Sequence, residues 1–180
     1  RSALLFAGED GVAAVSIIMY LQFLCIGIYF GFSMGLSTPL GYAYGDRNFS
    51  VCRVLEKYAY RFFAIAPIIL YGCTYLLTPI GVRFFASPGS TVFDMAVSGM
   101  RLYGLGFLFS GINIFAAIRM MTYGKGYISG MITFLRSFAL LLLFLTVLPR
   151  FLELNGIWLA VPAAEILTLI VALWTLRKKL

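Results

Sequence analysis

The chain has 180 residues, of which 62% are hydrophobic and 12% are charged. Soluble domains carry about a quarter charged residues, so this composition indicates a membrane protein and excludes a disordered, collagen-like or disulfide-scaffold chain. Histidine is absent, which removes the most common metal ligand and general base and disfavours metalloenzymes and His-dependent hydrolases. Fourteen Lys and Arg against seven Asp and Glu give a net charge of +7, whose meaning depends on where the cations lie.

The three cysteines form no recognisable metal site. Cys25 and Cys73 lie inside apolar runs and Cys52 lies in a basic segment, without the spacings typical of zinc ligands. We interpret them as small buried hydrophobic residues and a free thiol, and we expect no metal ion.

Five segments are long and apolar enough to cross a membrane as helices. A crossing needs about 20 residues, because a helix rises about 1.5 Å per residue through about 30 Å of hydrocarbon. Short joints predict antiparallel neighbours in one domain covering residues 1–180. The expected spans are 12–37, 58–78, 95–118, 127–148 and 156–176. The sequence therefore predicts an all-α membrane protein built as a bundle of about five transmembrane helices.

Prolines are expected to end the first two spans. The run from Gly11 to Gly45 has no charged residue and is longer than one crossing needs, so Pro39 is expected to end the first helix near residue 37. An apolar elbow would then reach Gly45. Pro79 is expected to end the second helix in the same way. Residues 1–8 are apolar but too short to span, and we interpret them as the end of a preceding helix.

The distribution of cations predicts the orientation. Cytoplasmic loops of membrane proteins are enriched in Lys and Arg. Alternating spans place most cations on one face, namely Arg47, Arg53, Lys57, Arg61, Arg119, Lys125, Arg177, Lys178 and Lys179. The other face has Arg1, Arg83 and Arg150. The first face is therefore expected to be cytoplasmic, with the C-terminus on it, and the basic excess indicates topology and not nucleic-acid binding.

Two charged residues are expected near the middle of the membrane. Glu165 and Arg136 each lie about 14 Å into a span, counted from opposite faces, so the two side chains are able to meet. A charge at that depth is costly unless it is paired or hydrated. Two interpretations stay open: a protonatable or substrate-facing site, and a structural ion pair. Arg101 lies nearer the outer interface, where its side chain is expected to snorkel or to join the site.

Further polar and small residues within the spans are candidates for helix contacts. Gln22 and Asn113 are weaker site candidates, because buried polar groups mostly form helix-to-helix hydrogen bonds. Glycines recur every four residues in the first and fourth spans, and are expected to pack helices together or to let them bend or slide. They are Gly27, Gly31, Gly35, Gly126 and Gly130.

The order of these segments resembles a known transporter family. Residues 8–14 (GEDGVAA), a long span and residues 35–47 (GLSTPLGYAYGDR) resemble the eighth helix and following cytoplasmic elbow of multidrug and toxic compound extrusion (MATE) transporters. Residues 156–165 (GIWLAVPAAE) resemble the start of that family's twelfth helix. The chain departs from the pattern in its third span. There the only carboxylate is Asp94 at the outer edge, whereas several family members carry a deeper acidic cation site. Glu165 is then the sole deep carboxylate.

The resemblance implies a C-terminal lobe, which is half of a twelve-helix, two-lobe transporter that exports cationic drugs in exchange for Na⁺ or H⁺. The expected partners are membrane lipids, a small cationic substrate and the missing N-terminal six-helix lobe. No cofactor is expected besides the coupling ion, and the expected location is the inner (plasma) membrane. The sequence has no ATP-binding loop, so transport would depend on an ion gradient or on another chain.

Two other functions remain open at this stage. A lipid-linked saccharide flippase of the same superfamily would line its cavity with cations such as Arg101 and Arg136 to hold a pyrophosphate. A non-transporting membrane scaffold subunit needs no such site. An enzyme is not expected, because no span carries a histidine, a catalytic cysteine arrangement or paired carboxylates.

Overall fold

The computed structural model describes residues 2–177, and every regular element in that range is a helix. The seven α-helices are α1 (Ser2–Gly45), α2 (Phe49–Val82), α3 (Thr91–Tyr103), α4 (Phe107–Thr122), α5 (Gly126–Phe134), α6 (Leu140–Val147) and α7 (Pro149–Arg177). A 3₁₀ turn, Gly104–Gly106, joins α3 to α4, and a π-helical turn, Leu135–Ala139, joins α5 to α6. The chain thus forms five segments that are long and apolar enough to cross a membrane, which confirms the predicted fold class.

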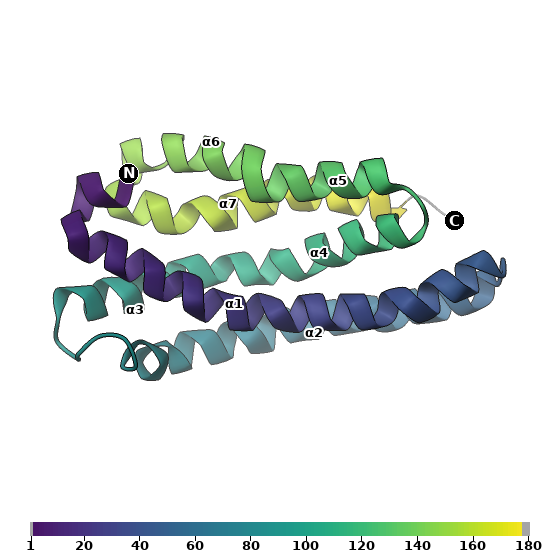
Figure 1. The fold of residues 1–180 in the computed structure, drawn as a ribbon, viewed down its shortest axis with the longest axis horizontal. Coiled ribbons are helices and arrows are strands. Elements are labelled where there is room, and N and C mark those ends of the chain that lie inside the picture. Colours follow the sequence, from purple (N-terminus) through teal and green to yellow (C-terminus); the bar gives the residue numbers. More distant parts are fainter. Residues whose placement is uncertain (1, 178–180) are drawn as a thin grey trace.

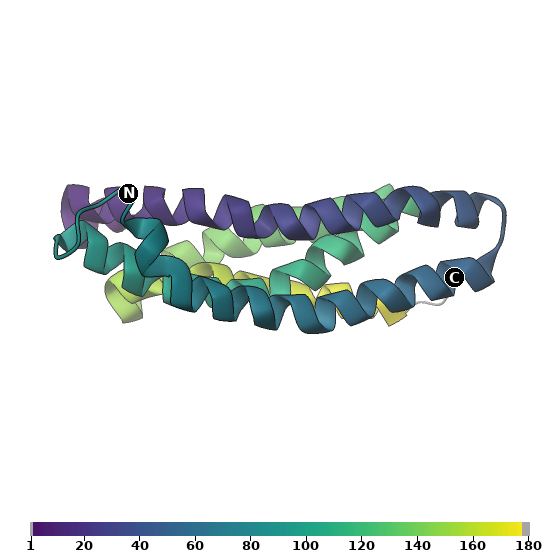
Figure 2. The same cartoon turned by 90° about the horizontal axis from the view of Figure 1, so that it is seen from below.

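The five segments lie side by side and reverse direction at each connection (Figure 1). The α1–α2 and α4–α5 connections and the C-terminal end lie at one end of the bundle. The α2–α3 and α6–α7 connections lie at the other. Helix α4 is central, because it contacts α1, α2, α5 and α7. From below, α1 and α2 extend as a long pair beyond the other helices (Figure 2).

The predicted helix ends at the two prolines are wrong. Helix α1 continues through Pro39 to Gly45, and α2 continues through Pro79 to Val82. A break inside the membrane exposes several backbone groups to hydrocarbon, whereas a proline within a helix removes only one donor. Continuing the helix is therefore the less costly solution.

The second helix also begins earlier than predicted, at Phe49, where the side chain of Asn48 accepts a hydrogen bond from the backbone N–H of Val51. This N-cap supports a polar first turn that hydropathy alone does not reveal. Gly8 interrupts α1 with a φ of 59°, a left-handed conformation suited to glycine. The interpretation of residues 1–8 as a preceding helix stays a prediction, and Arg1 lies outside the described residues.

The glycine stripes make no close helix contact within the described residues, so their packing role stays a prediction. A methyl group added at any of the five would meet no other atom within 4 Å. They are Gly27, Gly31, Gly35, Gly126 and Gly130. Other glycines do permit close contact: a Cβ at Gly99 would lie 2.8 Å from Trp158, one at Gly111 would lie 2.8 Å from Phe63, and one at Gly156 would lie 2.5 Å from the backbone of Leu148. Helix α4 is therefore the tightly packed axis, and the stripe on α1 faces outward.

The cysteines also differ in part from the prediction. All three are free thiols, but Cys52 in the basic segment is the fully buried one and Cys73 is exposed. Cys25 lies between these extremes. On a membrane helix, the residues that face lipid and those that face the protein core are both apolar. Apolar neighbours in the sequence therefore do not show that a cysteine is buried.

Candidate functional site

Glu165 lies at the junction of three helical segments. Its side chain projects from α7 and is buried, with 3% of the residue exposed. Arg136, on the π-helical turn, donates to the Oε1 atom of Glu165 from Nη2 at 2.7 Å and from Nε at 3.1 Å. Asn113, on α4, donates from Nδ2 to Oε2 at 2.7 Å and to the backbone oxygen of Glu165 at 2.9 Å. The expected contact between Glu165 and Arg136 is present, and Asn113 completes the cluster.

Irregular backbone surrounds this cluster. Arg136 lies within the π-helical turn, a feature that is frequent at functional sites because it re-aims the side chains of a helix. Gly106 of the 3₁₀ turn packs against α7, where an added Cβ would lie 3.5 Å from the backbone nitrogen of Pro162. Pro162 is one turn before Glu165 and lacks a backbone donor. The backbone around the site is thus irregular at the 3₁₀ turn and at the π-helical turn.

The cluster is electrically neutral but has unused acceptor capacity. The side chains of Arg136 and Glu165 are only 11% and 4% exposed, so their charges gain more from each other than they would in water. The Oδ1 atom of Asn113 is buried without a hydrogen-bond partner among the described residues. Carboxylate and amide oxygens are ligands for hard cations, and a carboxylate also accepts a proton. Among residues 2–177 there is no group of three His, Cys, Asp or Glu that could hold a metal ion.

Arg136 connects the cluster to an open cavity of about 420 Å³. Apolar side chains of α1 and α4 line one part of this cavity, and Ser129, Thr133 and Ser137 line it beside Arg136. A second cavity of about 320 Å³ adjoins it along α1, with Gln22 and Gly27 in its wall. The two cavities share Ile26 and Phe30. One open surface therefore runs along α1 from Gln22 to the Arg136–Glu165 pair.

Of the remaining predicted site residues, Gln22 lies at the cavity wall and Arg101 lies elsewhere. Gln22 accepts a hydrogen bond from the hydroxyl of Tyr103 and so contributes to the cavity wall. Arg101 is not part of the Glu165 cluster. Its guanidinium lies over the ring of Tyr75, 4.5 Å from the centroid, and its Nε has no hydrogen-bond partner in the described chain. The aromatic ring stabilises the cation by its quadrupole.

A second buried ion pair was missed by the sequence reasoning. Arg119 donates from Nε to the Oε1 atom of Glu56, and the hydroxyl of Tyr123 donates to the same oxygen at 2.6 Å. Arg119 is 3% exposed, so its side chain is buried in the bundle, and its predicted place on the cytoplasmic side stays a prediction. Glu56 is thus a second buried carboxylate besides Glu165. Lys178 and Lys179, counted on the same face, lie outside the described residues.

The missed pair has a recognisable sequence signal. Glu56 follows Cys52 by four residues and precedes Ala59 by three, and all three side chains are buried on one face of α2. A helical-period reading of residues 49–63 would have placed Glu56 inward. Burial, together with the hydrogen bond to Glu56, raises the pKa of the Tyr123 phenol above its usual range, so this hydroxyl keeps its proton and remains a donor.

The comparisons with known proteins agree with this architecture. The sequence model of the MatE family matches residues 2–148. An outward-facing multidrug resistance MATE family transporter of the MOP superfamily is similar, with a TM-score of 0.86 and 22% identity over 97% of this chain and 40% of that one. A MATE protein solved in complex with MaL6 gives a TM-score of 0.87 and 20% identity over 97% of this chain and 40% of that one.

A third similar structure is a MOP superfamily transporter from Pyrococcus furiosus, for which a reversed polarity of the binding pocket is said to suggest a different function. It gives a TM-score of 0.85 and 21% identity over 97% of this chain and 40% of that one. The chain therefore spans about 40% of the length of these relatives. No curated protein matches it.

Proposed function

Because the chain belongs to the MatE family, we propose that it is the C-terminal lobe of a secondary active efflux transporter that exchanges organic cations for H⁺ or Na⁺. The observation that carries this proposal is the Glu165 carboxylate, neutralised by Arg136 at the wall of an open cavity. The chain is a multi-pass membrane protein by its five apolar helices and its family. Its proposed location is the plasma membrane with a cytoplasmic C-terminus.

The coupling would follow from the charge of the cluster. With Glu165 ionised, the pair with Arg136 is neutral, and a cationic substrate meets no repulsion in the cavity. A proton or sodium ion that reaches the carboxylate weakens its hold on Arg136 and leaves a net positive charge beside the cavity. In a poorly polarisable environment that charge repels a bound organic cation. The coupling ion and the substrate would therefore exclude each other, which is the requirement for exchange.

If sodium is the coupling ion, it would bind to oxygen atoms of the same Glu165 cluster. The Oε2 atom of Glu165 and the amide of Asn113 are adjacent, and Oδ1 of Asn113 has no partner within the described chain. Sodium is a hard cation that prefers such oxygens. Imposing a proton gradient and a sodium gradient separately on the same vesicles distinguishes the two coupling ions.

A partner lobe is part of this proposal. Alternating access requires two lobes that rock around a site near the midplane. The exposed glycine face of α1 and the two cavities beside it supply one wall for such a site. We expect the coding sequence upstream of Arg1 to encode the six helices of an N-terminal lobe and the rest of the helix that ends at residues 1–8. A translation start immediately before Arg1 would contradict the two-lobe arrangement and favour the scaffold subunit.

The flippase alternative is supported less well. A cavity that holds a pyrophosphate needs cations whose charge is free to act on the ligand. Two donors of Arg136 are directed to Glu165, and the guanidinium of Arg101 lies over Tyr75. The cluster therefore offers no net positive charge to hold a pyrophosphate, and the proposal includes no enzymatic step.

The test uses the full-length protein in proteoliposomes, with a fluorescent organic cation and an imposed ion gradient. Glu165→Gln removes the carboxylate charge and leaves Arg136 permanently positive, so gradient-driven movement of the cation should be lost and its binding weakened. An uncharged analogue of the same dye should bind as well as it does to the unchanged protein, because it is not repelled. Glu153→Gln is the matched control, since Glu153 is exposed at the start of α7. Undiminished coupled transport by Glu165→Gln would overturn the proposal.

A further inference from the structure

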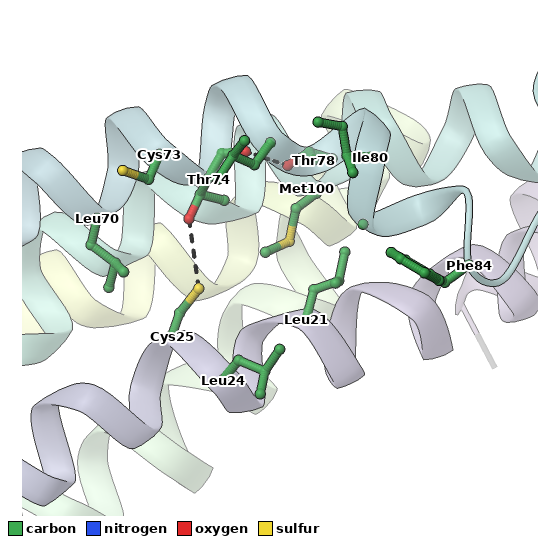
Figure 3. Close-up of a pocket in the computed structure, with 12 residues that line it drawn as sticks. Leu21, Leu24, Cys25, Leu70, Cys73, Thr74, Thr78, Ile80, Phe84 and Met100 are labelled. Atoms are coloured by element: carbon green, nitrogen blue, oxygen red, sulfur yellow. Dashed lines mark hydrogen bonds between the residues drawn. The ribbon is translucent and has the colours of Figure 1, made fainter.

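A third cavity, separate from the Glu165 cluster, lies between α1 and α2 and holds about 340 Å³ (Figure 3). Leu21, Leu24 and Cys25 contribute from α1, and Leu70, Cys73 and Leu77 contribute from α2. Its volume is within the range of ordinary small-ligand sites. Several rim side chains are exposed, including Leu24 and Phe84, so this groove opens sideways from the bundle.

The side chains that line the groove suit a hydrocarbon chain and do not suit a polar ligand. No charged residue lines it. Its two threonine hydroxyls already have partners: Thr78 donates to the backbone oxygen of Thr74, and the Thr74 hydroxyl lies 3.6 Å from the sulfur of Cys25. Figure 3 shows both interactions within the groove. A polar ligand would find no charged group and only spare acceptor positions of these hydroxyls there, and it would lose its own hydration.

The length of the groove along α2 is close to the thickness of one leaflet of a bilayer. It extends along α2 from Leu70 to Gly81, about 16 Å at the rise of a helix, which is close to half of a hydrocarbon core about 30 Å thick. Gly81 lies one residue before the end of α2, which is also the end of the segment apolar enough to cross a membrane. Arg83 follows, is exposed, and is next to Phe84 of the groove rim. A cation thus lies at the interfacial end of an apolar groove of leaflet depth.

We propose that this groove binds an acyl chain of a phospholipid from the leaflet at the Arg83 end, with the lipid phosphate paired to Arg83. The apolar wall would contact the acyl chain, and Arg83 would pair with the phosphate of the headgroup, because a cation near the surface attracts anionic lipid groups. The site is distinct from the Arg136–Glu165 cluster and does not depend on the transport proposal.

The experiment uses the full-length protein in vesicles that contain phosphatidylglycerol with a photoactivatable group on one acyl chain. After irradiation, peptide mass spectrometry locates the attached lipid. We expect label on residues 21–25 and 70–84. Cys73→Trp fills the groove from an exposed position and should remove most of that label. Ile68→Trp is the matched control, because Ile68 is exposed on the same helix but does not line the groove.

A second variant and a second probe test the headgroup. Arg83→Gln should reduce labelling by phosphatidylglycerol about fivefold, as expected for the loss of one interfacial cation. Labelling by a diacylglycerol carrying the same photoactivatable chain should not change, because that probe has no phosphate. Equal labelling of the Cys73→Trp and Ile68→Trp variants would overturn the acyl site. An absence of label at these residues in the unchanged protein would show that another part of the protein covers the groove, and would also overturn it. If Arg83→Gln leaves phosphatidylglycerol labelling unchanged, the phosphate assignment is wrong.

Discussion

Arg136 donates two hydrogen bonds to a single carboxylate oxygen of Glu165, from a position 29 residues earlier in the chain. The other oxygen is bound by Asn113, so the two oxygens are held from different helices. Glu165 thereby links α7 to the π-helical turn and to α4. Its charge and the packing of these helices are coupled, and each partner of the carboxylate can be tested separately.

Asn113→Leu should destabilise the protein modestly. The substitution removes the donor to Oε2 of Glu165 and leaves that oxygen buried without a partner. Hydrogen bonds between membrane helices contribute about 1 kcal/mol, so we expect a lower thermal midpoint for the purified full-length protein. Ser110→Ala is the matched control, because Ser110 lies on the same helix and its hydroxyl has no partner among the described residues. Equal midpoints for the two variants would contradict the role of Asn113.

Glu56→Leu should be strongly destabilising, because it leaves the buried Arg119 without its carboxylate. Removing one partner of a buried ion pair costs about 3–5 kcal/mol, whereas replacing both partners by apolar residues is often close to neutral. The double variant Glu56→Leu, Arg119→Met should therefore recover most of the loss, as measured by thermal unfolding. Arg53→Met, at an exposed position of α2, should change stability little. Additive losses in the double variant would show that the two charges do not depend on each other.

Two glycines are expected to respond differently to the same change. Gly111→Ala places a methyl group 2.8 Å from the ring of Phe63 and 3.2 Å from Tyr29, both in the core, so overpacking should cost about 1–3 kcal/mol. Gly31→Ala meets no atom within 4 Å and should leave the thermal midpoint unchanged or raise it, because alanine favours helix. If the full-length protein tolerates Gly111→Ala and not Gly31→Ala, the close helix contact lies at α1 and not at α4.

Thiol labelling tests the orientation. A cysteine in place of Ser87, in the loop between α2 and α3, should react with an impermeant maleimide in intact cells. A cysteine in place of Lys125, in the turn before α5, should react only after the membrane is opened. The two positions lie at opposite ends of the bundle. The native Cys52 should remain unlabelled in the folded protein in either condition, because it is fully buried. The reverse pattern at positions 87 and 125 would invert the predicted topology.

The sequence by itself determined that residues 2–177 contain five segments able to cross a membrane, and that Glu165 and Arg136 lie at similar depth. Both conclusions depend on properties of single helices: the thickness of the hydrocarbon sets the length of an apolar span, and the helical rise sets the depth of a residue within it. The cost of an unpaired charge in lipid then indicated that the two residues meet. The salt bridge between them agrees with that reasoning.

Only the tertiary structure decided which faces of the helices are in contact. In lipid, an outward face and a packed face are both apolar, so periodicity does not say how a helix such as α1 is rotated. For this reason the sequence did not reveal that Gly27, Gly31 and Gly35 face open space among the described residues, whereas Gly111 lies in close contact with Phe63. The partners of Asn113 and Glu56 also depend on the rotation of neighbouring helices, which brings together residues 52 and 63 positions apart.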